Sequence, residues 1–338
     1  MIHEGKEVGS IELPRCVQVE PVGRRMLPRR MTALSMRVDG LRGGPPALLS
    51  FDAFLRILDE LPDLEELRLQ GEGEPLSHPR FFDMVRAAAR RGIAVSTTST
   101  LQVFNRRLAE ECVRSGLRAL HVPLDRAGTR DYDFSRRGAR HERMLRHLRW
   151  LTEARRVQGS QTPHITLTAV LMRRNLEGLA EAVRLAHDHG ADGVAARSLR
   201  DFADGVPASA GNGRIGRFVE SETLTATDAP AVERCVAQAR ALAQELGVGL
   251  QIPPAPVAER TRVACPWPWN ATCIDFSGEA RSCDLAARAS GQAFGNVLKD
   301  GFATVWRSDS YRKFRERHLG GDLEGLCAHC PRIHSPAS

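Results

Sequence analysis

The sequence predicts an α/β fold, a partial (β/α)6 TIM-type barrel followed by a small cysteine-rich domain. Short apolar runs alternate with amphipathic helical stretches from about residue 15 to residue 252. Such strand–helix repeats are typical of a parallel sheet covered by helices. A proline-rich segment at residues 253–256 ends the alternation, and cysteines and turns follow it. We therefore expect two domains, residues 1–256 and residues 257–338.

Each apolar run and each amphipathic stretch has the length of an ordinary strand or helix. The candidate strands are residues 16–20, 65–70, 93–98, 118–123, 164–171, 193–197 and 248–252. The candidate helices are residues 51–61, 79–91, 105–115, 142–157, 176–189 and 230–246. Glycines follow several of these helices directly, as expected one residue past a helix C-terminus: Gly92, Gly116, Gly190 and Gly247.

Composition narrows the class of protein. A hydrophobic content of 42% over 338 residues is ordinary for a globular chain with a large core. No run of about 18 apolar residues occurs, so we expect no membrane helix. The first residues lack the apolar stretch of a signal peptide. We expect a cytoplasmic protein.

The formal net charge of +7 raises the question of a nucleic-acid partner. Nearly all of the positive charge is arginine, with lysine only at positions 6, 299 and 313, and the arginines are scattered over many predicted helices. Scattered charge is typical of solvated helix faces, so we expect no nucleic-acid partner.

The eight cysteines are unevenly distributed. Five of them, Cys265, Cys273, Cys283, Cys327 and Cys330, fall in the last quarter of the chain. Cytoplasmic proteins rarely keep structural disulfides, and cysteines clustered in this way indicate a metal site.

A glycine-rich turn follows the second candidate strand. Residues 71–75 read GEGEP, and α/β barrels place their ligand sites at this end of the strands. Gly71 and Gly73 would let the backbone approach a ligand closely, and Glu74 could meet an ammonium group. The alternative is a tight turn before a helix that starts with proline.

The GEGEP turn resembles the GGEP motif of radical S-adenosylmethionine (SAM) enzymes, which holds the amino group of SAM. The strand end at residues 95–100 is similar to their TTNG-type motif, and residues 120–125 are similar to their SLDG motif. The order and spacing of these motifs extend the resemblance over nearly the whole chain. The resemblance implies a SAM-like pocket containing Gly71, Gly73, Glu74, Thr98 and Asp125.

The C-terminal segment resembles the SPASM or twitch domain that follows many radical SAM barrels. Cys265, Cys283, Cys327 and Cys330 match its ligand positions. The resemblance implies one auxiliary 4Fe–4S cluster, although four thiolates would also satisfy tetrahedral zinc. Cys273 lies outside the pattern and is interpreted as a buried thiol or an extra ligand.

The family's CxxxCxxC motif, which ligates the radical-generating cluster, does not occur in this sequence. Its three positions correspond to Arg25, Arg29 and Thr32, and arginine cannot ligate iron because it stays protonated. The resemblance therefore implies that this chain cannot generate the 5′-deoxyadenosyl radical. We hypothesise that Arg25 or Arg29 binds the carboxylate of SAM or another anionic ligand. The alternative is that both arginines face solvent.

These features favour a degenerate radical-SAM/SPASM-like protein that binds substrate or a partner in a modification or biosynthetic pathway. A competent radical SAM homologue, a peptide or a small molecule would be its partner. The alternatives are a non-radical SAM-using group-transfer enzyme and an electron-transfer protein that uses the auxiliary cluster. His78 and His121 lie near predicted strand ends, but no residue pattern indicates a general base or a nucleophile, so catalytic residues are unassigned.

Overall fold

The structure, a computed structural model, divides into two compact units that we describe separately. The first contains the described residues up to Val95 and between Arg260 and Ser335, and the second contains those between Ser96 and Ile252. The described residues are 11–23, 47–124, 135–199, 213–252, 260–262, 265–284, 293–324, 327–328, 330 and 334–336.

The sheet of the first unit is centred on β1 (Cys16–Val19). β2 (Glu66–Leu69) pairs with β1 in parallel on one side, and β9 (Ala271–Ile274) pairs with it in parallel on the other. The antiparallel strands β10 (Glu279–Arg281) and β11 (Ala293–Asn296) continue the sheet beyond β9. Strands of the cysteine-rich segment therefore extend the sheet that the N-terminal strands begin.

Short helices accompany this sheet. They are α1 (Phe51–Asp59), α2 (Phe81–Ala89), α9 (Trp267–Asn270), α11 (Val297–Asp300), α12 (Phe302–Trp306) and α13 (Asp309–Gly320), with the 3₁₀ turn η1 (Pro75–Ser77) after β2. Strands β8 (Arg260–Arg262) and β12 (His334–Pro336) pair in a small separate sheet.

Polar contacts tie α1 to the cysteine-rich segment. Arg56 donates to the carbonyl of Leu298 at 2.8 Å, and the backbone N–H of Phe302 donates to the Glu60 carboxylate at 2.5 Å. These contacts and the β1–β9 pairing explain why both segments belong to one compact unit. The boundary at residue 256 remains a prediction from the sequence.

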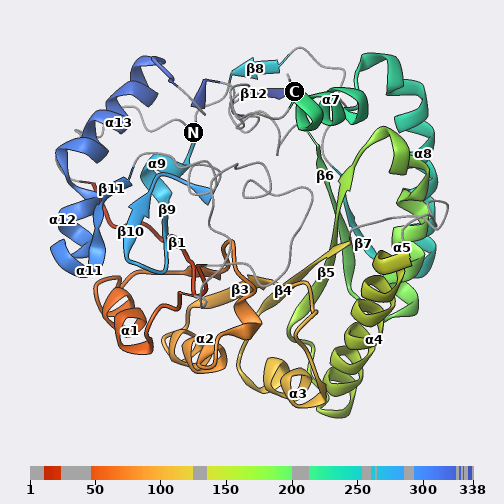
Figure 1. Cartoon of the computed structure of the whole chain (residues 1–338), viewed down its shortest axis with the longest axis horizontal. Helices are drawn as coiled ribbons and strands as arrows, with labels where there is room; N and C mark the ends of the chain where they lie inside the picture. Colours follow the sequence, from red (N-terminus) through yellow and green to blue (C-terminus); the bar gives the residue numbers. More distant parts are fainter. Residues whose placement is uncertain are drawn as a thin grey trace. The chain divides into compact units, whose positions relative to one another are not determined.

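The second unit is a parallel sheet with the order β3 (Ala94–Thr98), β4 (Ala119–Leu124), β5 (His164–Leu171), β6 (Gly193–Ser198) and β7 (Gly249–Gln251). Figure 1 shows α4, α5 and α8 along one face of the later strands. The helices of this unit are α3 (Arg106–Arg114), α4 (Ser135–Val157), α5 (Leu179–Asp188), α7 (Gly213–Glu222) and α8 (Ala229–Leu246), with the 3₁₀ turns η2 (Arg173–Gly178) and η3 (Ala226–Asp228).

The prediction of an α/β fold with a mostly parallel sheet is confirmed. Every predicted strand is present with its ends within one residue of the predicted bounds. The predicted C-cap glycines take the left-handed conformation, with φ of 79° at Gly92, 86° at Gly116, 68° at Gly190 and 66° at Gly247. Helix α4 begins at Ser135, earlier than the predicted residue 142.

The sheet core is formed by alternate residues of the predicted strands, because successive side chains of a strand point to opposite faces. Val17 and Val19 of β1 and Leu67 and Leu69 of β2 are fully buried. No helix within the described ranges has both the length and the apolar character needed to cross a bilayer.

Candidate functional site

The glycine-rich turn after β2 packs directly on the end of β1. The Glu20 carboxylate accepts a hydrogen bond from the backbone N–H of Glu72 at 2.5 Å. A Cβ on Gly71 would lie 2.3 Å from this carboxylate, and a Cβ on Gly73 would lie 2.2 Å from the carbonyl oxygen of Val22. The sequence interpretation assigned these glycines to ligand approach, whereas in the structure packing against β1 already requires them.

Glu20 is a half-buried carboxylate that contacts this turn. Burial raises its pKa from 4.5 to about 7, although the hydrogen bond from Glu72 acts in the opposite direction. The negative charges of Glu72 and Asp275 add to the increase. The conformation of the turn is therefore linked to the protonation state of one side chain.

Glu74 lies where the turn enters η1. Its carbonyl accepts from the hydroxyl of Ser77 at 2.6 Å and from the Ser77 backbone N–H at 3.0 Å. These bonds fix the backbone from which the Glu74 side chain projects. The turn thus holds a carboxylate at the end of a parallel strand, as the sequence predicted for an amine-binding position.

His78 has a structural environment. Its Nδ1 accepts from the backbone N–H of Arg80 at 3.0 Å, so the proton lies on Nε2, which donates to the carbonyl of Leu49 at 2.9 Å. Burial lowers the pKa of His78. With both ring nitrogens bonded to backbone, the structure favours an anchoring role over that of a general base.

The remaining predicted pocket residues divide between the second unit and the parts outside the described residues. Thr98 ends β3, where it is in register with His121 of β4. Arg25, Arg29, Thr32 and Asp125 lie outside the described residues.

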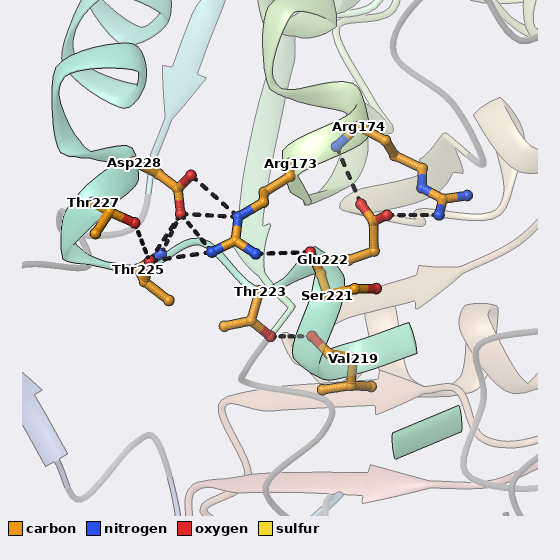
Figure 2. Close-up of polar contacts among 9 residues, drawn as sticks. All are labelled: Arg173, Arg174, Val219, Ser221, Glu222, Thr223, Thr225, Thr227 and Asp228. Atoms are coloured by element: carbon orange, nitrogen blue, oxygen red, sulfur yellow. Dashed lines mark hydrogen bonds and ion pairs between the residues drawn. The ribbon is translucent and has the colours of Figure 1, made fainter. Parts of the chain in front are cut away.

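Two consecutive arginines at the end of β5 form a polar network that the sequence analysis missed (Figure 2). Arg173 donates through Nε to both carboxylate oxygens of Asp228 at 3.1 Å, and through another guanidinium nitrogen to the carbonyl of Ser221 at 2.9 Å. Arg174 donates to Glu222 at 2.6 Å, and its guanidinium lies 4.9 Å from the ring centroid of Phe218. In the sequence, the signal that could have indicated this network is the Arg173-Arg174 pair just after the predicted strand at residues 164–171.

The network holds α7 and the start of α8 at the end of β5. The hydrogen bond from Arg173 lowers the pKa of Asp228. Burial favours a higher pKa for Glu222, but the hydrogen bonds from Arg174 outweigh it and the pKa is lowered. Both carboxylates are thus stabilised in the ionised form that the arginines bind.

The four predicted cluster ligands all lie in the first unit. Cys265 precedes α9, Cys283 follows β10, and Cys327 and Cys330 follow α13. All four are half-buried. Burial raises the pKa of Cys327 to about 12, and the thiols of Cys283, Cys330 and Cys265 add to the increase.

This donor set fits an iron–sulfur cluster. Thiolates are the ligands of such clusters, and iron would supply the positive charge that stabilises four thiolates. In the part of the chain that the structure describes, no three His, Cys, Asp or Glu side chains are already placed around a single metal position. Cys273 is buried on β9, in agreement with its interpretation as a core thiol.

Two protein-family models match this chain, one in its N-terminal part and one in its C-terminal part. Residues 31–190 match the radical SAM superfamily, and residues 265–331 match SPASM, an iron–sulfur cluster-binding domain. Both families that the sequence motifs resemble are therefore matched by segments of this chain. Its SPASM match begins at the first predicted cluster ligand, Cys265, and ends just after the last, Cys330. Iron–sulfur clusters and SAM are the cofactors that these two domains imply.

A curated relative matches this chain over most of its length. It is the tungsten-containing aldehyde ferredoxin oxidoreductase cofactor-modifying protein of Pyrococcus furiosus, 23% identical over 283 residues. The match covers 79% of this chain and 75% of the relative.

Solved structures share the radical SAM fold. SuiB of Streptococcus suis, bound to the precursor peptide SuiA, matches with a TM-score of 0.61 and 14% identity over 89% of this chain and 66% of SuiB, slightly less than two thirds of its length. The structure of anSMEcpe with bound AdoMet matches with a TM-score of 0.61 and 9% identity over 95% of this chain and 88% of that one. At these identities the likeness concerns the fold alone.

Proposed function

We propose that this chain is a radical-SAM/SPASM protein that holds one auxiliary 4Fe–4S cluster and does not generate the 5′-deoxyadenosyl radical. It binds substrate or a partner protein in a modification or biosynthetic pathway. Cys265, Cys283, Cys327 and Cys330 ligate the cluster. The strand-end residues Gly71, Gly73, Glu74, Thr98 and Asp125 contribute to binding SAM.

The absence of CxxxCxxC from the sequence carries this proposal. The radical-generating cluster needs three thiolates near the first strand, and the corresponding positions Arg25, Arg29 and Thr32 provide none. The four C-terminal cysteines would ligate a single cluster. In this proposal Arg25 or Arg29 replaces the open iron as the group that binds the SAM carboxylate.

The relatives support two classes of substrate. The Pyrococcus furiosus relative is named for modifying a cofactor, and SuiB binds a precursor peptide. We therefore propose that the substrate is a small molecule or a peptide. This chain either binds the substrate itself or presents it to a competent radical SAM homologue.

Anaerobic reconstitution separates one cluster from two. We expect about four irons per chain in the wild type, and about eight in the triple variant R25C/R29C/T32C, which restores the missing thiols. With SAM and a strong reductant, the wild type should form no 5′-deoxyadenosine. Calorimetric titration of SAM into wild type and R25A, with R24A as the control for loss of one nearby positive charge, tests the carboxylate contact.

Two results would overturn the proposal. Formation of 5′-deoxyadenosine by the wild type would show that the radical-generating site is intact. A wild-type iron content of about eight would show a second cluster with ligands other than these three positions. Equal SAM affinity in wild type and R25A would remove Arg25 from the carboxylate contact.

A further inference from the structure

The loop after β3 contains a leucine in a conformation that leucine rarely adopts. Leu101 has a φ of 54°, although it is not a glycine, and its side chain is fully buried. A left-handed non-glycine residue costs about 1–2 kcal/mol, so surrounding contacts must hold it in place. Such residues are concentrated at ligand-binding sites, and this one lies just beyond Thr98.

Hydrogen bonds hold the loop on both sides of this residue. The buried Ser99 accepts from the backbone N–H of Leu101 through its hydroxyl at 3.0 Å, and its own backbone N–H donates to the carbonyl of His121 at 3.0 Å. The carbonyl of Leu101 lies 2.6 Å from Nδ1 of His147, in the middle of α4. A carbonyl can only accept, so Nδ1 of His147 carries the proton.

Aromatic contacts fix the imidazole ring of His147. It stacks on Trp150 with centroids 4.8 Å apart, and Phe104 lies 6.0 Å away. Arg106 covers the Trp150 ring at 5.4 Å. Burial lowers the pKa of His147, which favours the neutral ring that this hydrogen bond needs.

We propose that His147 is a positioning residue for the ligand-binding end of β3. By holding the Leu101 carbonyl, it keeps Leu101 in its left-handed conformation and so fixes the backbone at Thr98 for SAM. This inference rests on the proposed function, which assigns SAM to that strand end. Packing alone would not require histidine, because burying a polar ring costs stability that an apolar residue would not lose.

Three variants separate the hydrogen bond from the packing. H147N keeps a donor at the position of Nδ1, because the asparagine Nδ2 branches from the same carbon. H147L keeps apolar bulk and removes the donor. L148A, at the adjacent fully buried residue of α4, is the control for general loss of helix packing.

Amide hydrogen exchange tests the loop without any ligand. We expect the Leu101 amide to exchange at least about tenfold faster in H147L than in the wild type, because the loop that holds this amide on Ser99 opens more readily once the Leu101 carbonyl loses its hydrogen bond to His147. In H147N the exchange rate of the Leu101 amide should stay within about threefold of the wild-type rate, because the asparagine donor retains the hydrogen bond to the Leu101 carbonyl. L148A should speed exchange in α4 more than in residues 99–102.

SAM titration by calorimetry then tests positioning. The affinity should fall about tenfold or more in H147L and be largely restored in H147N, while L148A should stay within about twofold of the wild type. If the wild type does not bind SAM, the proposed function fails, and exchange at Leu101 still reports whether His147 holds the loop. If H147L exchanges faster yet binds SAM as tightly as the wild type, or if H147N and H147L behave alike, the positioning role is wrong.

Discussion

Replacing Glu20 with glutamine should change how the stability of the protein depends on pH. Burial raises the pKa of Glu20 from 4.5 to about 7. An acid with a raised pKa keeps its proton in the folded state while the unfolded chain releases it. The stability contributed by the neutral form is therefore greatest at low pH and is lost as the pH rises from about 4.5 to about 7.

The magnitude follows from the size of the shift. A difference of roughly 2.5 pKa units at about 1.4 kcal/mol per unit gives about 3.5 kcal/mol over the complete titration, of which about 2.5 kcal/mol is lost between pH 5 and pH 8. Glutamine has nearly the same shape, can still accept from the Glu72 N–H and cannot ionise. The stability of E20Q relative to the wild type should therefore increase by about 2.5 kcal/mol between pH 5 and pH 8.

Urea unfolding followed by circular dichroism at several pH values between about 5 and 8 measures this difference. Histidines that titrate in the same window contribute equally to both proteins and cancel in the comparison. E66Q is the control, because it removes an exposed carboxylate from the neighbouring strand β2 without touching the turn. A constant difference between E20Q and the wild type over the whole range would refute the reasoning.

Three further changes test the cluster, the turn and the barrel. C283S should reduce the iron content from about four per chain to below about one, measured by iron assay after anaerobic reconstitution, because a 4Fe–4S cluster needs all four thiolates. G73A should destabilise the first unit by about 2–3 kcal/mol in urea unfolding, since its Cβ would lie 2.2 Å from a backbone carbonyl that cannot easily move. R155M should lower the free energy of unfolding by about 3 kcal/mol in the same assay. The Arg155 side chain is 12% exposed and donates to Asp192 at 2.5 Å and to the carbonyls of Pro163 and Gly190, and methionine would lose all of these hydrogen bonds.

Each of these variants has a matched control in the chain. C273S removes a buried thiol on β9 outside the ligand set and should keep the iron. G320A adds a Cβ to a position with no atom within 4 Å and should leave stability nearly unchanged. R156M breaks an exposed pair with Glu153 and should cost less than about 1 kcal/mol. Equal effects within any pair would contradict the corresponding explanation.

The sequence identified the strands and the helix ends because each is encoded locally. The strands appear as short apolar runs, and the helix ends are marked by glycines that accept a positive φ, such as Gly247. Local patterns of this kind survive folding because they depend on neighbouring residues alone. The cluster ligands Cys265, Cys283, Cys327 and Cys330 remain a prediction from the resemblance to SPASM domains.

Tertiary structure decided what the glycine-rich turn and the strand-end loop do. Glu20 lies 52 positions before Glu72, and His147 lies 46 positions after Leu101, so neither contact has a local pattern. The need for glycine at positions 71 and 73 comes from Glu20 and Val22, which follow β1 and lie against the turn. Such roles depend on which distant side chains the sheet and helices bring together, and only packing of the complete chain determines that.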